Sequence, residues 1–283
     1  MTGIPRYSAE ENLRRISRQK RLKFIVVEGA HDMPIYDYVI RCITEDSADF
    51  DVIYAGGKVA IQEFLSANNN LTNCLFIVDK DFDDVYLEYE NLVYLERYSI
   101  ENYFFCNEVI ASALAISLKC KVSDIKKLIS ISDFDDKNKN VLLKLLKAIV
   151  FYQRVIIPAR QIGSFTPTWS DAFICNTEGW EVCPQRADSL INQLIPEGIS
   201  QDDIDECFAS CFTEDFDMIK TFPGKMLKTS LHRFIRTKIQ SIGNKSLNTK
   251  FANFDTAYEL LTAHLHKSPD LKNILLPVKN FVE

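Results

Sequence analysis

The 283-residue sequence lacks a long uninterrupted apolar run. Its most apolar helical stretch, residues 141–157, is interrupted by Lys144, Lys147 and Arg154. A membrane-spanning helix needs about 20 mainly apolar residues, and a signal peptide needs an apolar segment close behind a basic start. Because the sequence contains neither, we expect a protein without a membrane span that is located in the cytoplasm. Internal repeats and low-complexity segments are also missing.

A recognisable pattern of cysteine spacing is missing too. The eight cysteines are scattered and come without a secretory context, which favours reduced thiols over disulfides. Cys207 and Cys211 have helical i, i+4 spacing and could join Cys175 and Cys183 in a zinc site, but these spacings match no zinc ribbon or finger. We therefore leave zinc out of the prediction.

Positive charge is scarce for a nucleic-acid-binding protein, since the formal net charge is −6. Its distribution is nevertheless uneven. Residues 220–250 contain eight basic residues and no Asp or Glu, and six further basic residues lie between Arg14 and Lys23. Acidic residues gather after Asp79 and between residues 197 and 217. With 47% hydrophobic residues, the chain can form one large domain or two unequal ones.

The most informative stretch is CLFIVDKDFDD, residues 74–84. Its first part is a short apolar run that is typical of a buried parallel strand, and four aspartates, Asp79, Asp81, Asp83 and Asp84, follow at once. Carboxylates delivered together at a strand tip repel one another unless a hard divalent cation offsets their charge. The alternative is a polar loop that caps a helix.

A second acidic residue stands in a matching setting. The run Lys23–Gly29, KFIVVEG, also predicts a buried strand and ends at Glu28. In an open α/β sheet, ligands collect at the carboxyl ends of neighbouring parallel strands. We therefore expect Glu28 to face the same crevice as Asp79 and Asp81.

The pattern around these strands predicts an α/β fold in which a parallel sheet is flanked by helices. Gly56 and Gly57 predict a tight turn before a helix that opens at Lys58. The other expected elements are helices at residues 9–21 and 33–43 and strands at 52–54 and 92–95.

Together, these motifs resemble a Toprim domain, the metal-dependent catalytic module of topoisomerases, primases and OLD-type nucleases. The resemblance lies in a strand that ends in Glu28-Gly29, a second strand followed by Gly56-Gly57-Lys58, and a third that ends in Asp79-Lys80-Asp81. A further motif, SIENYFF at Ser99–Phe105, is similar to a branch of Toprim-like proteins that accompany ABC or AAA ATPases. That branch includes the Toprim effectors of the PARIS anti-phage defence system.

The resemblance implies a nuclease that depends on Mg²⁺ or Mn²⁺. Its implied metal ligands are Glu28, Asp79, Asp81 and Asp83, of which the first three are also the implied catalytic residues. Lys58 is expected near the phosphate or the opposing sheet. Glu101 and Asn102 are expected to complete the metal shell or to orient its ligands. Without the resemblance, Ser99 would be a helix N-cap and Glu101 an acid in the first turn.

The resemblance also implies a biological setting. The expected protein is a toxin effector that cleaves host tRNA, acts as a homodimer and is sequestered by an ABC-type ATPase until infection is sensed. The first alternative is a DNA nuclease of the OLD type. The second is a catalytically silent Toprim-like scaffold whose acids bind a structural cation or arginines of a partner, with residues 197–217 as a docking surface.

Two domains are predicted, a catalytic core at residues 1–106 with the N-terminal basic helix, and a mainly helical region at 107–283. Helices are expected at 109–118, 123–131 and 140–152, and irregular structure is expected at 158–187 because of its Pro and Gly residues.

A basic helix is predicted at residues 225–240. Its apolar face lies nearly opposite a stripe formed by Lys225, Lys228, His232 and Arg236. This stripe suits phosphates along a nucleic-acid backbone, and the alternative is an ordinary solvated face. Lys58 and the stripe would supply positive charge that the acidic site lacks.

Overall fold

The computed structural model describes residues 7–45, 48–68, 71–82, 86–159, 179–213, 215–241 and 251–283. The chain forms two compact units. We call them the sheet unit, which comprises residues 1–80, 85–96 and 265–283, and the helical unit, which comprises residues 81–84 and 97–264. The end of the chain therefore belongs with the sheet, although more than half of the sequence separates the two.

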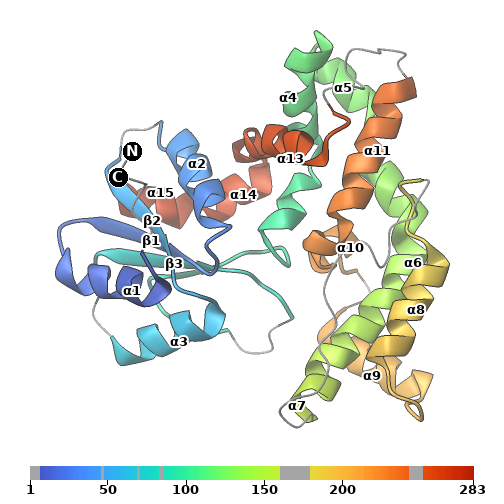
Figure 1. Ribbon diagram of the computed structural model, residues 1–283, viewed down its shortest axis with the longest axis horizontal. Helices are drawn as coiled ribbons and strands as arrows, with labels where there is room; N and C mark the ends of the chain where they lie inside the picture. Colours follow the sequence, from blue (N-terminus) through green and yellow to red (C-terminus); the bar gives the residue numbers. More distant parts are fainter. Residues whose placement is uncertain are drawn as a thin grey trace. The chain divides into compact units, whose positions relative to one another are not determined.

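The sheet unit contains four parallel strands in the order β2-β1-β3-β4 (Figure 1). The strands are β1 (Lys23–Val27), β2 (Phe50–Tyr54), β3 (Cys74–Val78) and β4 (Leu92–Tyr94). In the register of the sheet, Val26 of β1 lies beside Ile53 of β2 and Phe76 of β3. The parallel sheet predicted from the sequence is thus confirmed. The chain runs outward from β1 to β2 and then returns past β1 to β3, so the strand order reverses between β1 and β3.

Helices cover both faces of this sheet. Figure 1 shows α1 and α3 on one side of the strands and α2, α14 and α15 on the other. On the first face, Phe24, Val26 and Phe76 pack with Ile16 of α1 and Ile61 of α3 in one buried cluster. The helical elements of the sheet unit are α1 (Ala9–Arg18), α2 (Met33–Ile43), α3 (Lys58–Ala67), the 3₁₀ turn η5 (Leu265–Lys267), α14 (Pro269–Ile274) and α15 (Leu276–Val282).

The described part of residues 107–283 is mainly helical, as predicted, but residues 265–283 belong to the sheet unit, and the helical unit begins before residue 107. The elements of the helical unit up to residue 159 are the 3₁₀ helix η1 (Ile100–Phe104), α4 (Asn107–Leu118), α5 (Val122–Leu128), α6 (Ile131–Phe151), the π-helical turn η2 (Tyr152–Ile156) and α7 (Ile157–Ala159). The remaining elements are α8 (Pro184–Leu194), α9 (Gln201–Cys211), α10 (Met218–Thr221), the 3₁₀ turn η4 (Gly224–Leu227), α11 (Lys228–Ser241) and α13 (Phe254–Thr262).

The long helix α6 forms the centre of this unit. Leu142, Leu145 and Ile149 are fully buried along it. Its exposed face is joined to α8 and α9 by ion pairs, Lys144 with Asp188 at 2.6 Å and Lys147 with Asp205 at 2.7 Å. Surface pairs of this kind contribute little individually, so apolar burial along α6 is the main source of stability.

Several predicted boundaries differ from those observed. The helix predicted at 140–152 begins at Ile131, because most of the polar residues that precede position 140 lie on its exposed side, although Asn138 is buried. The region predicted to be irregular, 158–187, includes the first turn of α8, where Pro184 occupies the favourable first helical position. Residues 160–178 of that region lie outside the described residues. The predicted basic helix at 225–240 begins as the 3₁₀ turn η4 and continues as α11.

Within the parts of the chain that the structure describes, every helix is too short or too polar to cross a lipid bilayer.

Candidate active site

Glu28 and Asp79 lie side by side at the carboxyl end of the sheet. Glu28 directly follows β1 and Asp79 directly follows the neighbouring strand β3. The Oε1 atom of Glu28 accepts a hydrogen bond of 2.8 Å from the backbone N–H of Asp79. The two residues therefore occupy the point where the strand order reverses, which is the usual ligand-binding position in an open α/β sheet.

The Gly56-Gly57 turn fixes Glu28 from its other side. The backbone N–H groups of both glycines donate to the carbonyl oxygen of Glu28, at 3.0 and 2.9 Å. Their φ angles are 92° and 122°, values that side-chain-bearing residues rarely adopt. Lys58 then opens α3 as its first residue. Glu28 is therefore held at the strand tip by hydrogen bonds from Gly56 and Gly57 to its carbonyl oxygen and by a hydrogen bond from Asp79 to its carboxylate.

Asp81 is held by different neighbours. It belongs to the helical unit, where its backbone N–H donates to the carbonyl oxygen of Tyr98 at 3.0 Å. Its φ angle of 50° lies in the left-handed region, which aspartate adopts more readily than most residues other than glycine but at some cost in backbone energy. Asp83, the fourth predicted metal ligand, lies outside the described residues.

The donor chemistry of the predicted ligands fits a hard divalent cation, because Mg²⁺ prefers carboxylate oxygens. Among the residues that the structure describes, however, no three His, Cys, Asp or Glu side chains gather into a group that could hold a metal ion. The same observation applies to Cys183, Cys207 and Cys211 of the zinc site that we left out, and Cys175 lies outside the described residues.

The structure assigns Asn102 a role that differs from the predicted one. Its side chain is completely buried. The amide nitrogen donates to the carbonyl oxygens of Ile219 and Phe222, at 2.6 and 2.7 Å. The amide oxygen accepts from the backbone N–H and the hydroxyl of Ser99, both at 3.1 Å, and from the N–H of Gly224 at 3.2 Å. Because these groups use the whole amide, Asn102 joins η1 to residues 219–224 rather than contributing to a metal shell.

Glu101 also faces the interior of the helical unit. Its carboxylate lies 3.4 Å from the ammonium nitrogen of Lys228, and the two side chains are only 14% and 23% exposed. Lys228 additionally sits 4.3 Å from the centre of the Tyr258 ring. Two residues that we predicted to serve metal binding and phosphate binding are therefore paired with each other.

The predicted basic stripe on residues 225–240 is not a continuous exposed surface. Lys225 is exposed, but His232 is buried, stacks on Phe251 at 5.6 Å and forms a 2.7 Å hydrogen bond with the carbonyl oxygen of that residue. Burial lowers the pKa of His232, which favours its neutral form. The prediction that His232 contacts phosphate is corrected accordingly, and Lys225 and the half-buried Arg236 are the remaining members with a surface position.

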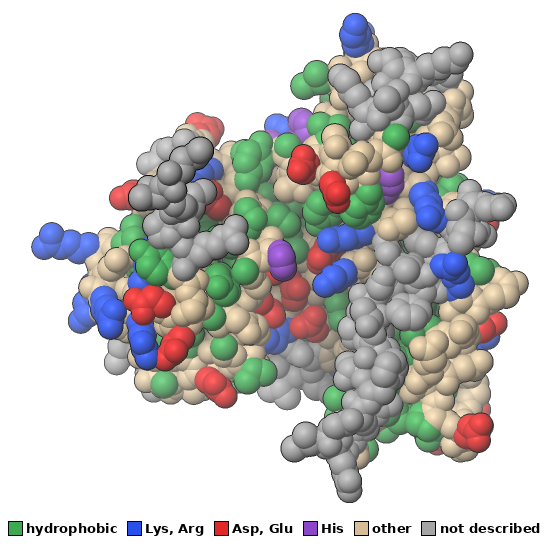
Figure 2. All heavy atoms as spheres, viewed as in Figure 1, with side chains coloured by type: hydrophobic (Ala, Val, Ile, Leu, Met, Phe, Trp, Pro, Cys, Tyr) green, Lys and Arg blue, Asp and Glu red, His purple; other side chains and the backbone are tan. Residues whose placement is uncertain are grey.

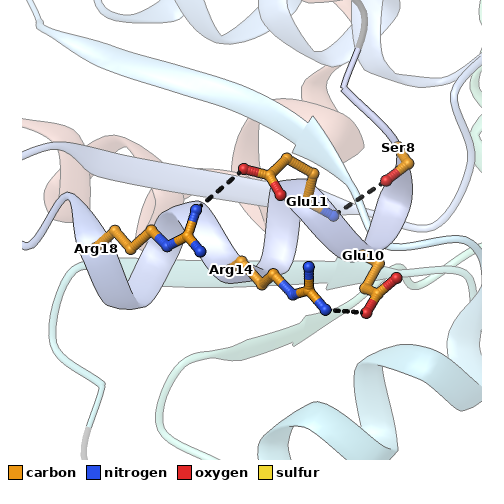
Figure 3. A network of polar contacts seen from close by, with 5 residues as sticks. All are labelled: Ser8, Glu10, Glu11, Arg14 and Arg18. Carbon is orange, nitrogen blue, oxygen red and sulfur yellow. Dashed lines mark hydrogen bonds and ion pairs between the residues drawn. The ribbon is translucent and has the colours of Figure 1, made fainter.

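The charge on α1 is more balanced than its arginines indicate. In Figure 3, Arg14 and Arg18 pair with Glu10 and Glu11 of the same helix, and Ser8 caps its first turn. Figure 2 likewise shows Lys and Arg side chains over α1 with acidic side chains among them.

The direction of α1 also places its basic end away from Glu28. Near the start of the helix, Asn12 donates to the carbonyl oxygen of Tyr54 at the carboxyl end of β2. Near its end, the side chain of Asn73, which directly precedes β3, donates to the carbonyl oxygen of Ile16. The bases that follow Ile16 are therefore at the amino edge of the sheet, opposite the strand tips.

One residue of interest was noted in the sequence only as an interruption. Arg154 breaks an apolar stretch, and its guanidinium group donates to the carbonyl oxygen of Phe82, at 2.7 Å from Nη2 and 3.2 Å from Nε. A lone arginine in an apolar helical stretch was the available signal, but its contact is 72 positions away and could not be read from the sequence.

Comparison with known proteins adds no identification. No model of a known protein family matches the chain, and no curated protein matches its sequence.

Proposed function

We propose that this protein is a metal-dependent phosphodiesterase in which Glu28, Asp79 and Asp81 form the reactive centre with Mg²⁺ or Mn²⁺. The observation that supports this proposal is the pairing of Glu28 with Asp79 at the reversal point of the sheet, where the carboxylate accepts a 2.8 Å hydrogen bond from its neighbour's backbone. Two acids at adjacent strand tips would repel an anionic phosphodiester. A bound cation would offset the negative charge of the acids and also attract the phosphate.

In this proposal, Asp79 and Asp81 bind the cation, and Glu28 either binds it as well or moves a proton near the scissile phosphate. The bound cation supplies Lewis-acid activation and orients the phosphate. The double hydrogen bond from Gly56 and Gly57 fixes the position of Glu28. Lys58 follows this turn at the start of α3, and in this proposal its positive charge would attract an anionic substrate to the same end of the sheet.

The proposed substrate is RNA, specifically host tRNA, and the proposed role is that of a toxin effector in anti-phage defence. Support comes from the resemblance of the strand-tip motifs and of Ser99–Phe105 to Toprim effectors of the PARIS type. We further propose that the active form is a homodimer and that an ABC-type ATPase holds the protein inactive. Cleavage of DNA in place of RNA would instead support the OLD-type alternative.

A second candidate function is favoured by a specific contact. Because the carboxylate of Glu28 accepts a backbone hydrogen bond from the next strand, it could serve purely to close the end of the β1–β3 pair. A catalytically silent scaffold would need no more than this.

The two candidates differ in what they predict for Glu28→Gln and Glu28→Ala. Glutamine retains an acceptor oxygen for the N–H of Asp79, whereas alanine removes it. For a nuclease, we expect Glu28→Gln to keep its thermal stability but to lose cleavage by at least about 100-fold, a typical effect for a general acid or base. Glu28→Ala should lose both activity and stability.

The assay compares total tRNA and plasmid DNA, each with Mg²⁺, Mn²⁺ or EDTA. Asp79→Asn tests the second acid, and Glu63→Gln, a change of an exposed acid on α3, is the matched control that should behave like the wild type. If the wild type cleaves neither substrate with metal supplied, or if Glu28→Gln cleaves as well as the wild type, the nuclease proposal is wrong and the scaffold is favoured.

A further inference from the structure

Arg154 contacts the backbone directly after the predicted metal ligand Asp81. It lies on η2, the π-helical turn that follows α6. Both its Nη2 and Nε atoms donate to one acceptor, the carbonyl oxygen of Phe82. π-Helical turns insert an extra residue into a helix, and they are frequent at functional sites because they redirect the side chains that follow.

The segment that Arg154 contacts has an unfavourable backbone conformation. Asp81 has a φ of 50°, which costs some backbone energy, and contacts on both sides stabilise it. On the amino-terminal side of Asp81, its own N–H donates to the carbonyl oxygen of Tyr98. On the carboxyl-terminal side, Phe82 is buried and its ring lies 4.7 Å from the ring of Tyr98. The carbonyl oxygen of Phe82 accepts the two hydrogen bonds from Arg154.

The guanidinium group is well suited to such a task. It is always charged and presents its donors on a rigid plane, so its two bonds to the carbonyl oxygen of Phe82 restrict the movement of that oxygen more than a single bond would. The carbonyl group of Phe82 belongs to the peptide that follows Phe82, so Arg154 anchors the chain one residue beyond Asp81. A shift of this anchor would be transmitted through the backbone of the buried Phe82 to Asp81 and so redirect the Asp81 carboxylate. Outer contacts of this kind typically change metal affinity or activity by about 10–100-fold when they are removed.

We propose that Arg154 is a positioning residue that holds the Asp81 carboxylate in the direction needed to bind the divalent cation. This inference rests on the proposed function, because it requires Asp81 to be a metal ligand. In this inference Arg154 acts on Asp81 through the backbone of Phe82, so it is a positioning residue and not a catalytic one.

The test measures Mn²⁺ binding directly by electron paramagnetic resonance, together with the Mg²⁺ concentration that gives half-maximal cleavage. Arg154→Ala should weaken Mn²⁺ binding by roughly 10–100-fold and raise the required Mg²⁺ concentration in proportion. Arg154→Lys, which keeps the charge and one donor, should fall between Arg154→Ala and the wild type. Lys144→Ala, which removes an exposed cation from the preceding helix, is the matched control and should bind like the wild type.

A purely structural role would lower thermal stability without changing metal affinity in the protein that remains folded. If Arg154→Ala does not fold, Arg154→Gln replaces it, with the same expected and contrary results. Wild-type Mn²⁺ affinity in these variants, while Asp81→Asn abolishes binding, would overturn the inference and leave the proposed function standing. If Asp79→Asn and Asp81→Asn both bind Mn²⁺ like the wild type, the proposed function fails, and the inference fails with it.

Discussion

Replacement of Asn102 by alanine should be among the most destabilising single changes in the helical unit. The side chain is fully buried, and its amide makes five hydrogen bonds, two as donor and three as acceptor. Alanine would delete all five. The carbonyl oxygens of Ile219 and Phe222 and the N–H of Gly224 would then lose these partners in a place that water reaches poorly.

The cost follows from the groups left behind. A buried polar group without a partner costs about 1–3 kcal/mol, so the three groups of residues 219–224 alone cost roughly 3–9 kcal/mol, and relaxation reduces this to about 4 kcal/mol. That is a large share of the roughly 5–15 kcal/mol that stabilises an average domain. At about 2–4 °C per kcal/mol, the melting temperature should fall by roughly 8–16 °C.

Thermal and urea unfolding of Asn102→Ala and Asn138→Ala provide the measurement. Asn138 is equally buried but makes only two such bonds, to Phe134 and Val182, so its loss should cost about half as much. Equal or smaller destabilisation by Asn102→Ala would refute the reasoning.

Gly224→Ala tests the same junction from its other side. A Cβ atom there would lie 2.6 Å from the Oδ1 atom of Asn102 and 2.7 Å from its backbone nitrogen. The single change should be strongly destabilising, and combining it with Asn102→Ala should cost less than the sum of the two, because the alanine removes part of the clash.

Two further predictions concern residues of α11. Burial lowers the pKa of His232, so on acidification through about pH 6.5 the unfolded chain gains a proton that the native protein does not. The free energy of unfolding should therefore decrease as the pH is lowered through this window. Urea unfolding at about pH 7.5 and 5.5 should show a smaller difference for His232→Gln than for the wild type. Lys228→Met should leave the carboxylate of the mostly buried Glu101 without its cation, and it should destabilise the protein by about 2 kcal/mol. In a double-mutant cycle, the double variant with Glu101→Gln should recover most of this loss. A stability profile of His232→Gln with the wild-type slope, or additive costs in that cycle, would contradict these two predictions.

The sheet could be predicted because its signals are local. The runs that became β1 and β3 are short, apolar and rich in β-branched or aromatic residues, and each ends abruptly at a carboxylate. The return of the chain end to this sheet had no such signal. Leu271, Leu275 and Val278 are completely buried there, and their spacing predicts helices, but a spacing cannot say which surface a helix will cover.

The candidate site likewise contains residues that the sequence could place and residues that it could not. Glu28 and Asp79 could be placed together because neighbouring parallel strands end at one edge, which is a rule of the fold. His232 was misplaced because helical periodicity reports the direction of a side chain and not what packs over it, and Phe251 supplies that cover from 19 residues further along the chain. Asn102 was misjudged because its partner Gly224 is 122 positions away.

The junction around Asn102 also determines how loss of activity can be interpreted. The backbone of Tyr98 accepts a hydrogen bond from Asp81 and donates one to the carbonyl oxygen of Lys220. The residue that directly precedes the SIENYFF motif therefore contacts both the predicted ligand and the segment that Asn102 holds. An Asn102 variant that loses cleavage would therefore not identify a metal ligand, because the same change loosens the support of Asp81. Two results together would connect this junction to the metal rather than to the fold. The Asn102 variant would have to lose Mn²⁺ binding well below its melting temperature, and Asn138→Ala, which changes a comparably buried residue, would have to keep it.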